Sequence, residues 1–503
     1  MVSMVMIESA SGKLVMLVKK KIISFIVATL LVVNIFTSIG RPVNAEGHFP
    51  TASEEIAAIN VGWNLGNTLD SYGTWISGTT PSAFETAWGN PVVTRELIQS
   101  VKAQGFNAIR IPVTWAQHID DNGNVDPAWM ARVKEVVDYA YEEDMYVILN
   151  VHHDTGEHGG DKVCWVIADE GTYTSTQDKF KALWTNIANE FESYDYHLMF
   201  EGYNEMLDMN NTWNAPSTGN GAYNAVNSYA QAFVDTVRAT GGNNAQRNLI
   251  VNTYVASYDS QVINNFVVPN DSATNHLALQ VHVYAPWGFT GTNATVNWTT
   301  VHSDFGDGDK SEIDGVMNAI SNFSSQTGLP VIIGECGAEY KNNDAAIAQY
   351  FSYFISSASS KGIKCFVWDN GQFGTGSSEG GYAIVNRSNL EWKTDIVTAI
   401  VSNSTQTPIQ NSPANEPIDE PIVETELAET TVVETTVEAT SATSETTIET
   451  TVETSETVTE PKATETKKSG VSVGVYVGVG VVFVIGAYVG LFFLGKSKGK
   501  KQS

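Results

Sequence analysis

Residues 331–337 read VIIGECG, in which four apolar or small residues lead directly into a carboxylate, Glu335. A short, almost continuous apolar run of this kind is typical of a strand that is buried on both faces. A carboxylate at the exit of such a strand needs a reason, because burying a charge without a partner is costly. The rest of the chain supplies that reason.

Seven further apolar runs occur between residues 50 and 402. In chain order they are AINVGWNLGN (58–67), NAIRIPVTW (107–115), YVILNVHHD (146–154), HLMFEGYNE (197–205), LIVNTYVAS (249–257), LALQVHVYA (277–285) and KCFVWDN (364–370). Segments between them have helical spacing, as where Val133, Val136, Val137 and Ala140 repeat at i, i+3, i+4 and i+7. Eight strands that alternate with helices predict an α/β fold, a (β/α)₈ TIM barrel.

In such a barrel the active site is built at the carboxyl ends of the strands. The residues that catch attention at these ends are Asn64, Asn67, Arg110, His152, His153, Asp154, Asn204, Glu205, His282, Tyr284, Glu335, Trp368 and Asp369. Each one alone is explained by an ion pair, a helix cap or core packing. All of them follow the same end of their strands, which independent packing roles do not require, so the sequence predicts an active site at this rim.

Two carboxylates at the rim suit one particular chemistry. Glu205 follows the fourth run and Glu335 ends the seventh, so their side chains can face each other across the barrel mouth. One carboxyl group can then protonate a leaving oxygen while the other attacks or activates water, which is the arrangement of a glycosidase. Arg110 beside a carboxylate would hold that group ionised as a nucleophile.

Metal catalysis is the main competing interpretation. The stretch HHDTGEH (152–158) offers three histidines and Asp154, but it lacks a familiar ligand spacing such as H-E-x-x-H. Adjacent histidines on a strand also point to opposite faces. Cys336 follows Glu335 and is expected to point away from it, and G-x-S-x-G is absent. We therefore expect no metal centre, no cofactor, and no Ser or Cys nucleophile.

Eight segments carry a family resemblance: GWNLGNTLD (62–70), AWGNP (87–91), IRIPVTW (109–115), VILNVHHD (147–154), FEGYNEM (200–206), VHVYAP (281–286), IIGECG (332–337) and FVWDNG (366–371). In this order they resemble family 5 glycoside hydrolases, most of all the bacterial endoglucanases (cellulases) of subfamily 4. The resemblance implies a retaining endo-β-1,4-glucanase that cleaves internal bonds of cellulose-type and mixed-linkage β-glucans by double displacement.

The resemblance also assigns the catalytic pair and its neighbours. It implies that Glu205 is the acid/base and that Glu335 is the nucleophile. It places His282 near the acid/base, and it places Arg110 and Tyr284 beside the nucleophile.

Further positions are assigned as contacts to the sugar. The resemblance directs Asn204 toward the sugar 2-hydroxyl and Trp368 under the sugar ring, and it matches Asn64 and His153 to the nonreducing side. Strand alternation favours His152 over its neighbour for the single histidine position of the family.

Several alternatives remain open. A xyloglucanase, mannanase or xylanase of the same family, or a transglycosylase, would use the same residues. A non-catalytic carbohydrate-binding surface protein is expected to have lost one glutamate or the arginine, and none is lost. Four tryptophans in the predicted rim loops can either stack on sugar rings or fasten loops to the barrel: Trp75, Trp88, Trp213 and Trp287.

The N-terminal residues 1–45 have the features of a secretory signal peptide. Three lysines precede an apolar run, KKKIISFIVATLLVVNIF (19–36), and VNA (43–45) supplies small residues for cleavage after Ala45. Met16 is a plausible start of translation. The alternative, a retained N-terminal membrane anchor, is disfavoured because the run is short for a spanning helix.

The C-terminal part predicts a surface tether. Residues 403–466 form a Thr/Glu-rich stalk whose composition cannot support a packed core, with fourteen acidic residues and one lysine between 405 and 466. Within 467–503, residues 471–494 carry no charge over 24 positions and precede a basic tail, which is typical of a membrane-spanning helix with a cytoplasmic end. The catalytic domain, 46–402, is thus expected outside the cell.

Composition limits the partners. The net charge of −28 reflects the stalk in large part and argues against nucleic acid. The three cysteines, Cys164, Cys336 and Cys365, are too few for a disulfide framework, although one bridge among them is possible. We expect a monomeric catalytic domain that acts on a β-glucan polysaccharide and contacts the membrane only through its C-terminal helix.

Overall fold

The computed structural model describes residues 49–291, 299–374 and 380–404. The predicted signal peptide, the predicted spanning segment and all but the first two residues of the predicted stalk lie outside these ranges. Within the described residues, no helix combines the length and the apolarity needed to cross a bilayer.

Eight parallel strands close into a barrel, with each strand paired to the next and the last paired to the first. They are β1 (Gly62–Leu65), β2 (Ala108–Ile111), β3 (Tyr146–Asn150), β4 (Leu198–Glu201), β5 (Leu249–Asn252), β6 (Leu277–Val283), β7 (Val331–Cys336) and β8 (Lys364–Asp369). All eight fall within the predicted apolar runs, which confirms the (β/α)₈ barrel. Strands β2 to β5 end four or five residues before their runs do, because the chain leaves the sheet there to build the rim, and the other four strands end one or two residues early.

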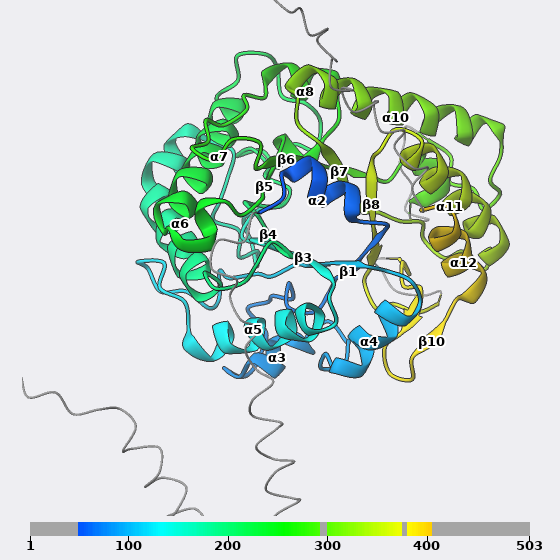
Figure 1. Cartoon of the computed structure of the whole chain (residues 1–503), viewed down its shortest axis with the longest axis horizontal. Coiled ribbons are helices and arrows are strands. Elements are labelled where there is room, and N and C mark those ends of the chain that lie inside the picture. Colours follow the sequence, from blue (N-terminus) through cyan, green and yellow to red (C-terminus); the bar gives the residue numbers. More distant parts are fainter. Residues whose placement is uncertain (1–48, 292–298, 375–379, 405–503) are drawn as a thin grey trace, which may run out of the picture. The chain divides into compact units, whose positions relative to one another are not determined.

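Helices surround the ring of strands (Figure 1). The longer ones are α4 (Arg95–Ala103), α5 (Pro127–Glu142), α6 (Glu170–Glu190), α7 (Gly221–Ala239), α10 (Asp307–Thr327), α11 (Asp344–Ser359) and α12 (Thr394–Ser402). The short elements are α2 (Ala52–Ala58), α3 (Pro81–Glu85), α8 (Ser260–Asn265), α9 (Trp287–Thr290), the 3₁₀ turns η1 (Gly242–Ala245) and η2 (Tyr254–Ala256), and the hairpin strands β9 (Val385–Asn386) and β10 (Glu391–Trp392).

Helix α2 covers the amino-terminal end of the barrel. Its Ile56 packs with inward-facing strand residues, among them Ile148, Ile250 and Ile332, in a separate apolar cluster. Figure 1 shows this helix in dark blue across the ring of strands. The end of the barrel opposite the predicted site is therefore filled by apolar side chains. This is expected, because in (β/α)₈ barrels the amino-terminal face contributes to stability and the carboxyl-terminal face carries the active site.

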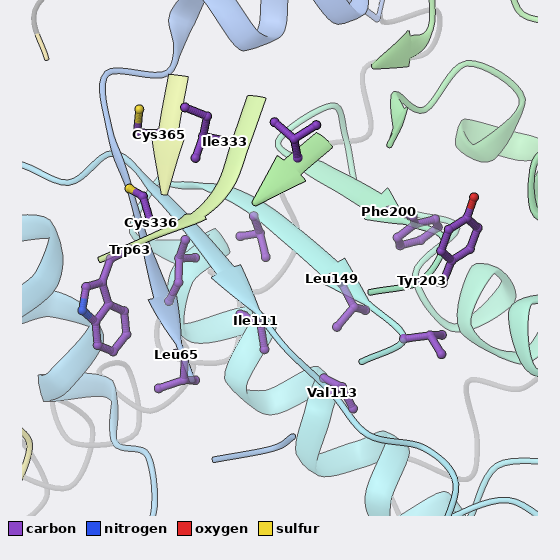
Figure 2. Close-up of a cluster of buried hydrophobic side chains, with 14 of the residues drawn as sticks. Trp63, Leu65, Ile111, Val113, Leu149, Phe200, Tyr203, Ile333, Cys336 and Cys365 are labelled. Atoms are coloured by element: carbon purple, nitrogen blue, oxygen red, sulfur yellow. The ribbon is translucent and has the colours of Figure 1, made fainter. Parts of the chain in front are cut away.

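A second, larger apolar cluster lies between the strands and the outer helices. Figure 2 shows part of it, including Trp63, Leu149, Phe200 and Cys336, which alternate along their strands with residues that face the barrel interior. The three cysteines all lie in the described part of the chain and are free thiols. Cys336 is buried in this outer layer, so the expectation that it points away from the barrel interior is confirmed.

The opening stretch VIIGECG contains a β-bulge. Along β7, the partners of Val281 and His282 are Ile333 and Glu335, so that Gly334 is an extra residue in the ladder. Strict alternation would put Glu335 on the same outer face as Ile333, and the bulge turns it inward. A Cβ on Gly334 would lie 2.1 Å from the Gln280 side chain, so no larger residue fits at this position without displacing Gln280.

Candidate active site

The interior of the barrel changes from apolar to polar one step above the cluster beneath α2. The inward positions of this next layer carry Asn64, Arg110, Asn150, Glu201, Asn252 and Gln280, one from each of β1 to β6. All six are fully buried. Five of the six form a connected hydrogen-bond network under the rim, in which Arg110 donates to Asn64 and Glu201, and Glu201 also accepts from Asn150 and Asn252. Gln280 instead places its Nε2 3.3 Å from Nε2 of His282.

Arg110 is the centre of this network, and all five of its N–H groups have acceptors. Nε and Nη2 donate to the two carboxylate oxygens of Glu201 at 2.7 and 2.8 Å. Nη1 donates to Oε1 of Glu335 at 2.7 Å and to Oδ1 of Asn64 at 3.0 Å. Nη2 also donates to Oδ1 of Asn204 at 2.9 Å. The guanidinium is therefore fixed in one orientation.

Glu335 receives hydrogen bonds on both carboxylate oxygens. Besides the bond from Arg110, the Tyr284 hydroxyl donates to Oε2 at 3.0 Å. His282 Nδ1 lies 3.6 Å from the same oxygen. Burial raises the pKa of Glu335, while the charges of His282 and Arg110 oppose that rise. The carboxylate is thus oriented by three neighbours and poised at the rim.

Glu205 lies on the loop after β4 and shares His282 with Glu335. His282 Nδ1 is 2.7 Å from Oε1 of Glu205, and the Glu205 side chain is the more exposed of the two carboxylates, at 21% against 7%. One oxygen of Glu205, one of Glu335 and a ring nitrogen of His282 lie within 4.8 Å of one another. Burial lowers the pKa of His282, but Glu335 and Glu205 outweigh burial and raise it.

His152 is held in one tautomer by its neighbour in the polar layer. The amide oxygen of Asn150 accepts a hydrogen bond from the backbone N–H of Val113, so its Nδ2 is the atom 3.0 Å from Nδ1 of His152. Nδ1 therefore accepts, and the ring proton is on Nε2. Burial lowers the pKa of His152 well below its usual value, which keeps the ring neutral. The ring is parallel to that of Trp368, with centroids 6.0 Å apart.

The prediction that His152 and His153 point to opposite faces, as adjacent residues of a strand do, is wrong. Strand β3 ends at Asn150, so His152 and His153 belong to the following loop, and a donor atom of each lies within 4.8 Å of the Asp70 carboxylate. The donor set resembles that of a transition-metal site. However, Asp70 already accepts backbone N–H bonds from Asn67 and Thr68, and His152 would have to change its tautomer. The residues therefore fit a metal poorly.

Sequence comparison assigns the family. A family model described as cellulase (glycosyl hydrolase family 5) matches residues 69–374. The chain belongs to glycosyl hydrolase family 5. This confirms the resemblance at the level of the family.

Individual relatives of this family 5 hydrolase are endoglucanases. It is 38% identical over 356 residues to endoglucanase A of Clostridium longisporum, which covers 70% of this chain and 65% of that protein, just under two thirds of its length. A solved broad-specificity endoglucanase of Ruminococcus champanellensis with bound cellotriose is 39% identical, with a TM-score of 0.66, and covers 71% of this chain and 100% of that one.

A second solved structure is a family 5 enzyme of Prevotella bryantii in complex with a xyloglucan tetradecasaccharide. It is 38% identical to this family 5 hydrolase, with a TM-score of 0.63, and covers 71% of this chain and 99% of the other.

The structure gathers the predicted residues of the family 5 hydrolase but places Asn64 differently from the expectation. Asn64 has no exposed surface; its oxygen accepts from Arg110 and its Nδ2 donates to the carbonyl of Gly334 at 2.9 Å. It supports the network from below instead of meeting a sugar at the nonreducing side. His153 is partly exposed, and its ring contacts Tyr72 and Trp88.

Sequence reasoning missed Asn150, Glu201, Asn252 and Gln280. Each is a polar residue inside an apolar run, two positions after an inward-facing apolar residue, and that period of two was the signal that could have found them. Strand β5 had contributed no predicted residue, yet Asn252 Nδ2 donates to Oε1 of Glu201 at 3.2 Å and to the carbonyl of Tyr203 at 2.7 Å.

The loop tryptophans of the family 5 hydrolase separate into two kinds. Trp88 donates from Nε1 to the carbonyl of Tyr72 at 3.0 Å and packs against that ring, so it fastens a loop. Trp75 and Trp213 are 60% and 51% exposed on the loops after β1 and β4. Their exposure makes these two the loop tryptophans best placed to stack on a ligand, whereas Trp287 is partly buried in the short helix α9.

Proposed function

We propose that this family 5 hydrolase is a retaining endo-β-1,4-glucanase. One observation carries the proposal: a Glu205 oxygen and a Glu335 oxygen lie within 4.8 Å of each other. Retaining glycosidases hold their two carboxyl groups about 5 to 5.5 Å apart, whereas inverting enzymes leave about 6.5 to 9.5 Å for a water molecule. The pair is therefore close enough for direct attack on the sugar by one carboxylate.

The reaction follows from the positions of these two groups. Glu335 attacks the anomeric carbon, forming a glycosyl ester, while Glu205 gives its proton to the departing glycosidic oxygen. Glu205 then takes a proton from water, the water oxygen bonds to the anomeric carbon, and the Glu335 ester bond breaks. Two inversions leave the β configuration unchanged. His282 Nδ1 lies 2.7 Å from Glu205 and 3.6 Å from Glu335. It can therefore stabilise negative charge on either carboxylate as the two groups exchange roles.

The remaining rim residues suit a neutral sugar. The fixed Nε2–H of His152 is a hydrogen-bond donor, and Asn204 can donate from Nδ2 because its oxygen is occupied by Arg110. Trp368 offers an indole face, and a Cβ on Gly66 would lie 2.6 Å from that ring, so the glycine allows the close approach. Flat β-1,4-linked glucose stacks on such a face.

The proposed substrate range is supported by solved relatives that contain bound oligosaccharides. The solved relatives hold cellotriose and a xyloglucan oligosaccharide. This supports carboxymethyl cellulose and mixed-linkage β-glucan as substrates of this chain, with xyloglucan as a second polymer. Mannan and xylan remain weaker candidates of the same mechanism.

The testing experiment follows viscosity and reducing ends together on each polymer, with the purified full-length chain. An endo-acting enzyme lowers viscosity early, and ¹H NMR should detect the β-anomer of the product first. An α-anomer formed first would refute the retaining assignment. Polymer binding without turnover would favour a non-catalytic surface protein, and products longer than the starting oligosaccharide would favour a transglycosylase.

We also infer from the sequence alone that the enzyme acts at the outer cell surface. The signal-like segment 1–45 would direct export, and the uncharged segment 471–494 with its basic tail would hold the chain in the membrane. The acidic stalk between 403 and 466 would extend the barrel away from the bilayer.

A further inference from the structure

Glu201 is a buried carboxylate that cannot meet a substrate. It ends β4 inside the barrel and has no exposed surface. Nevertheless it takes two of the five N–H groups of Arg110, one on each carboxylate oxygen, whereas Glu335 takes one. The principal counterion of the active-site arginine is thus Glu201 and not the nucleophile.

We propose that Glu201 is a positioning residue, which neutralises Arg110 and aims its remaining N–H groups at Glu335 and Asn204. The inference rests on the proposed function, because it concerns how Glu335 acts as a nucleophile. Glu201 acts through Arg110 and touches no reacting atom.

Geometry fixes the direction in which Arg110 points. Bonds to both carboxylate oxygens of Glu201 engage one edge of the planar guanidinium, the edge formed by Nε and Nη2, and leave Nη1 directed at Glu335. Glu201 is itself held, since Asn150 and Asn252 each donate to its Oε1 at 3.2 Å. The orientation of the nucleophile is therefore set two contacts away, in the polar layer.

Charge is the second part of the argument. A full positive charge 2.7 Å from Glu335 would stabilise its ionised form strongly, and a carboxylate whose pKa is lowered in this way attacks more weakly. Burial alone would raise the pKa of Glu201, but Arg110 lowers it below the ordinary value, so the pair is ionised on both sides and neutral in sum. The hydrogen bond from Arg110 consequently orients Glu335, while Glu201 offsets much of the positive charge that Glu335 would otherwise experience.

Other charged or titratable groups also face Glu335 and would remain in a Glu201 variant. Arg110 reaches it from β2, His282 from β6, Tyr284 from the residues just after β6, and Glu205 from the loop after β4. A change at Glu201 that alters the ionisation of Glu335 therefore acts mainly through the charge of Arg110, its strongest partner, and to a smaller extent through His282.

The test is the pH dependence of kcat/KM for the full-length protein and its Glu201→Gln and Glu201→Asp variants. The acid limb of this profile reports ionisation of the nucleophile in the free enzyme. Removing the negative charge at 201 should favour ionised Glu335 and move the acid limb to lower pH by about one unit. Glu201→Asp keeps the charge but moves it away from Arg110, so it should shift the limb the same way by less.

A matched control is Glu55→Gln, which removes another buried carboxyl group from α2 at the far end of the barrel. Its acid limb should match that of the wild type. An unmoved limb in Glu201→Gln would overturn the proposal; if near-UV circular dichroism shows that this variant does not fold, an unmoved limb in Glu201→Asp would do so.

Failure of the proposed function would look different. The wild type would then release no reducing sugar from any β-glucan at any pH. The role of Glu201 would still be decided by ¹³C NMR titration of the Glu335 carboxyl group, whose midpoint should fall in Glu201→Gln and stay constant in Glu55→Gln. An unchanged midpoint in Glu201→Gln would refute the inference.

Discussion

The Tyr284 hydroxyl donates a 3.0 Å hydrogen bond to Oε2 of Glu335. Burial, followed by the neighbouring Glu335 charge, raises the pKa of Tyr284 well above its ordinary value. The hydroxyl therefore keeps its proton at neutral pH and remains a donor to the nucleophile.

Replacing Tyr284 by Phe should reduce kcat by about 100-fold, the cost of losing one aligned donor beside a reacting oxygen. KM should change little, because the ring and its packing remain. The matched control is Tyr382→Phe, since Tyr382 packs against Tyr284 but donates to the carbonyl of Thr290. Equal losses in the two variants would argue against a specific role for the Tyr284 hydroxyl.

Glu335→Gly should abolish hydrolysis, and added azide should restore cleavage of an activated aryl β-glucoside. A small anion can enter the space that the carboxylate leaves, while Glu205 remains in place. The product expected by ¹H NMR is the α-glycosyl azide. A β-glycosyl azide would instead identify Glu205 as the nucleophile.

Replacing His282 by Gln should remove a pH dependence of stability. The folded-state pKa of His282 is raised by its carboxylate neighbours, so its charged form stabilises the protein fully below the unfolded pKa, about 6.5. This stabilisation is lost as pH rises through the higher folded-state value. The difference in Tm between wild type and variant should therefore shrink from pH 6 upward.

The control for this measurement is His302→Gln, because His302 is exposed and its carboxylate partner is Asp309, at 3.4 Å, and not a residue of the catalytic pair. It should reproduce the wild-type dependence of Tm on pH. A constant Tm difference between the wild type and His282→Gln at all pH values would contradict the assigned direction.

The exposed tryptophans should matter for long substrates only. Trp75→Ala and Trp213→Ala are expected to raise KM for a soluble β-glucan by about threefold to tenfold each, the value of one aromatic stacking contact. Activity on an aryl cellobioside should stay unchanged. Trp88→Ala should lower Tm by a few degrees, because this half-buried ring fastens Tyr72 and its loop. Loss of activity on the short substrate would show that the exposed rings shape the catalytic centre.

The membrane anchor predicted from the sequence is tested by fractionation. Full-length protein should sediment with membranes, resist extraction by high salt, and release its barrel when protease cuts the stalk. A variant that lacks residues 471–494 should appear in the medium. Release of the intact chain by salt would refute a spanning helix.

Sequence patterns predicted the barrel because each strand is a short apolar run and each outer helix repeats with helical spacing. They also predicted the rim, since parallel strands of one barrel share a carboxyl end, and this placed Glu205, Arg110, His282 and Glu335 together without knowledge of any contact. These conclusions depend on local periodicity and on the order of the strands and helices, and both can be recognised in the sequence.

Only the tertiary structure decided which residues carry the network under the rim. Alternation counted along VIIGECG would turn Glu335 outward, and the bulge at Gly334, which exists because β6 and β7 pair with one residue out of step, turns it inward. Glu201 reads as one charge within an apolar strand, and its pairing with Arg110 joins positions 91 residues apart. Such contacts depend on strand register and on how a buried charge is compensated, and these are properties of the closed barrel that no single segment of the sequence contains.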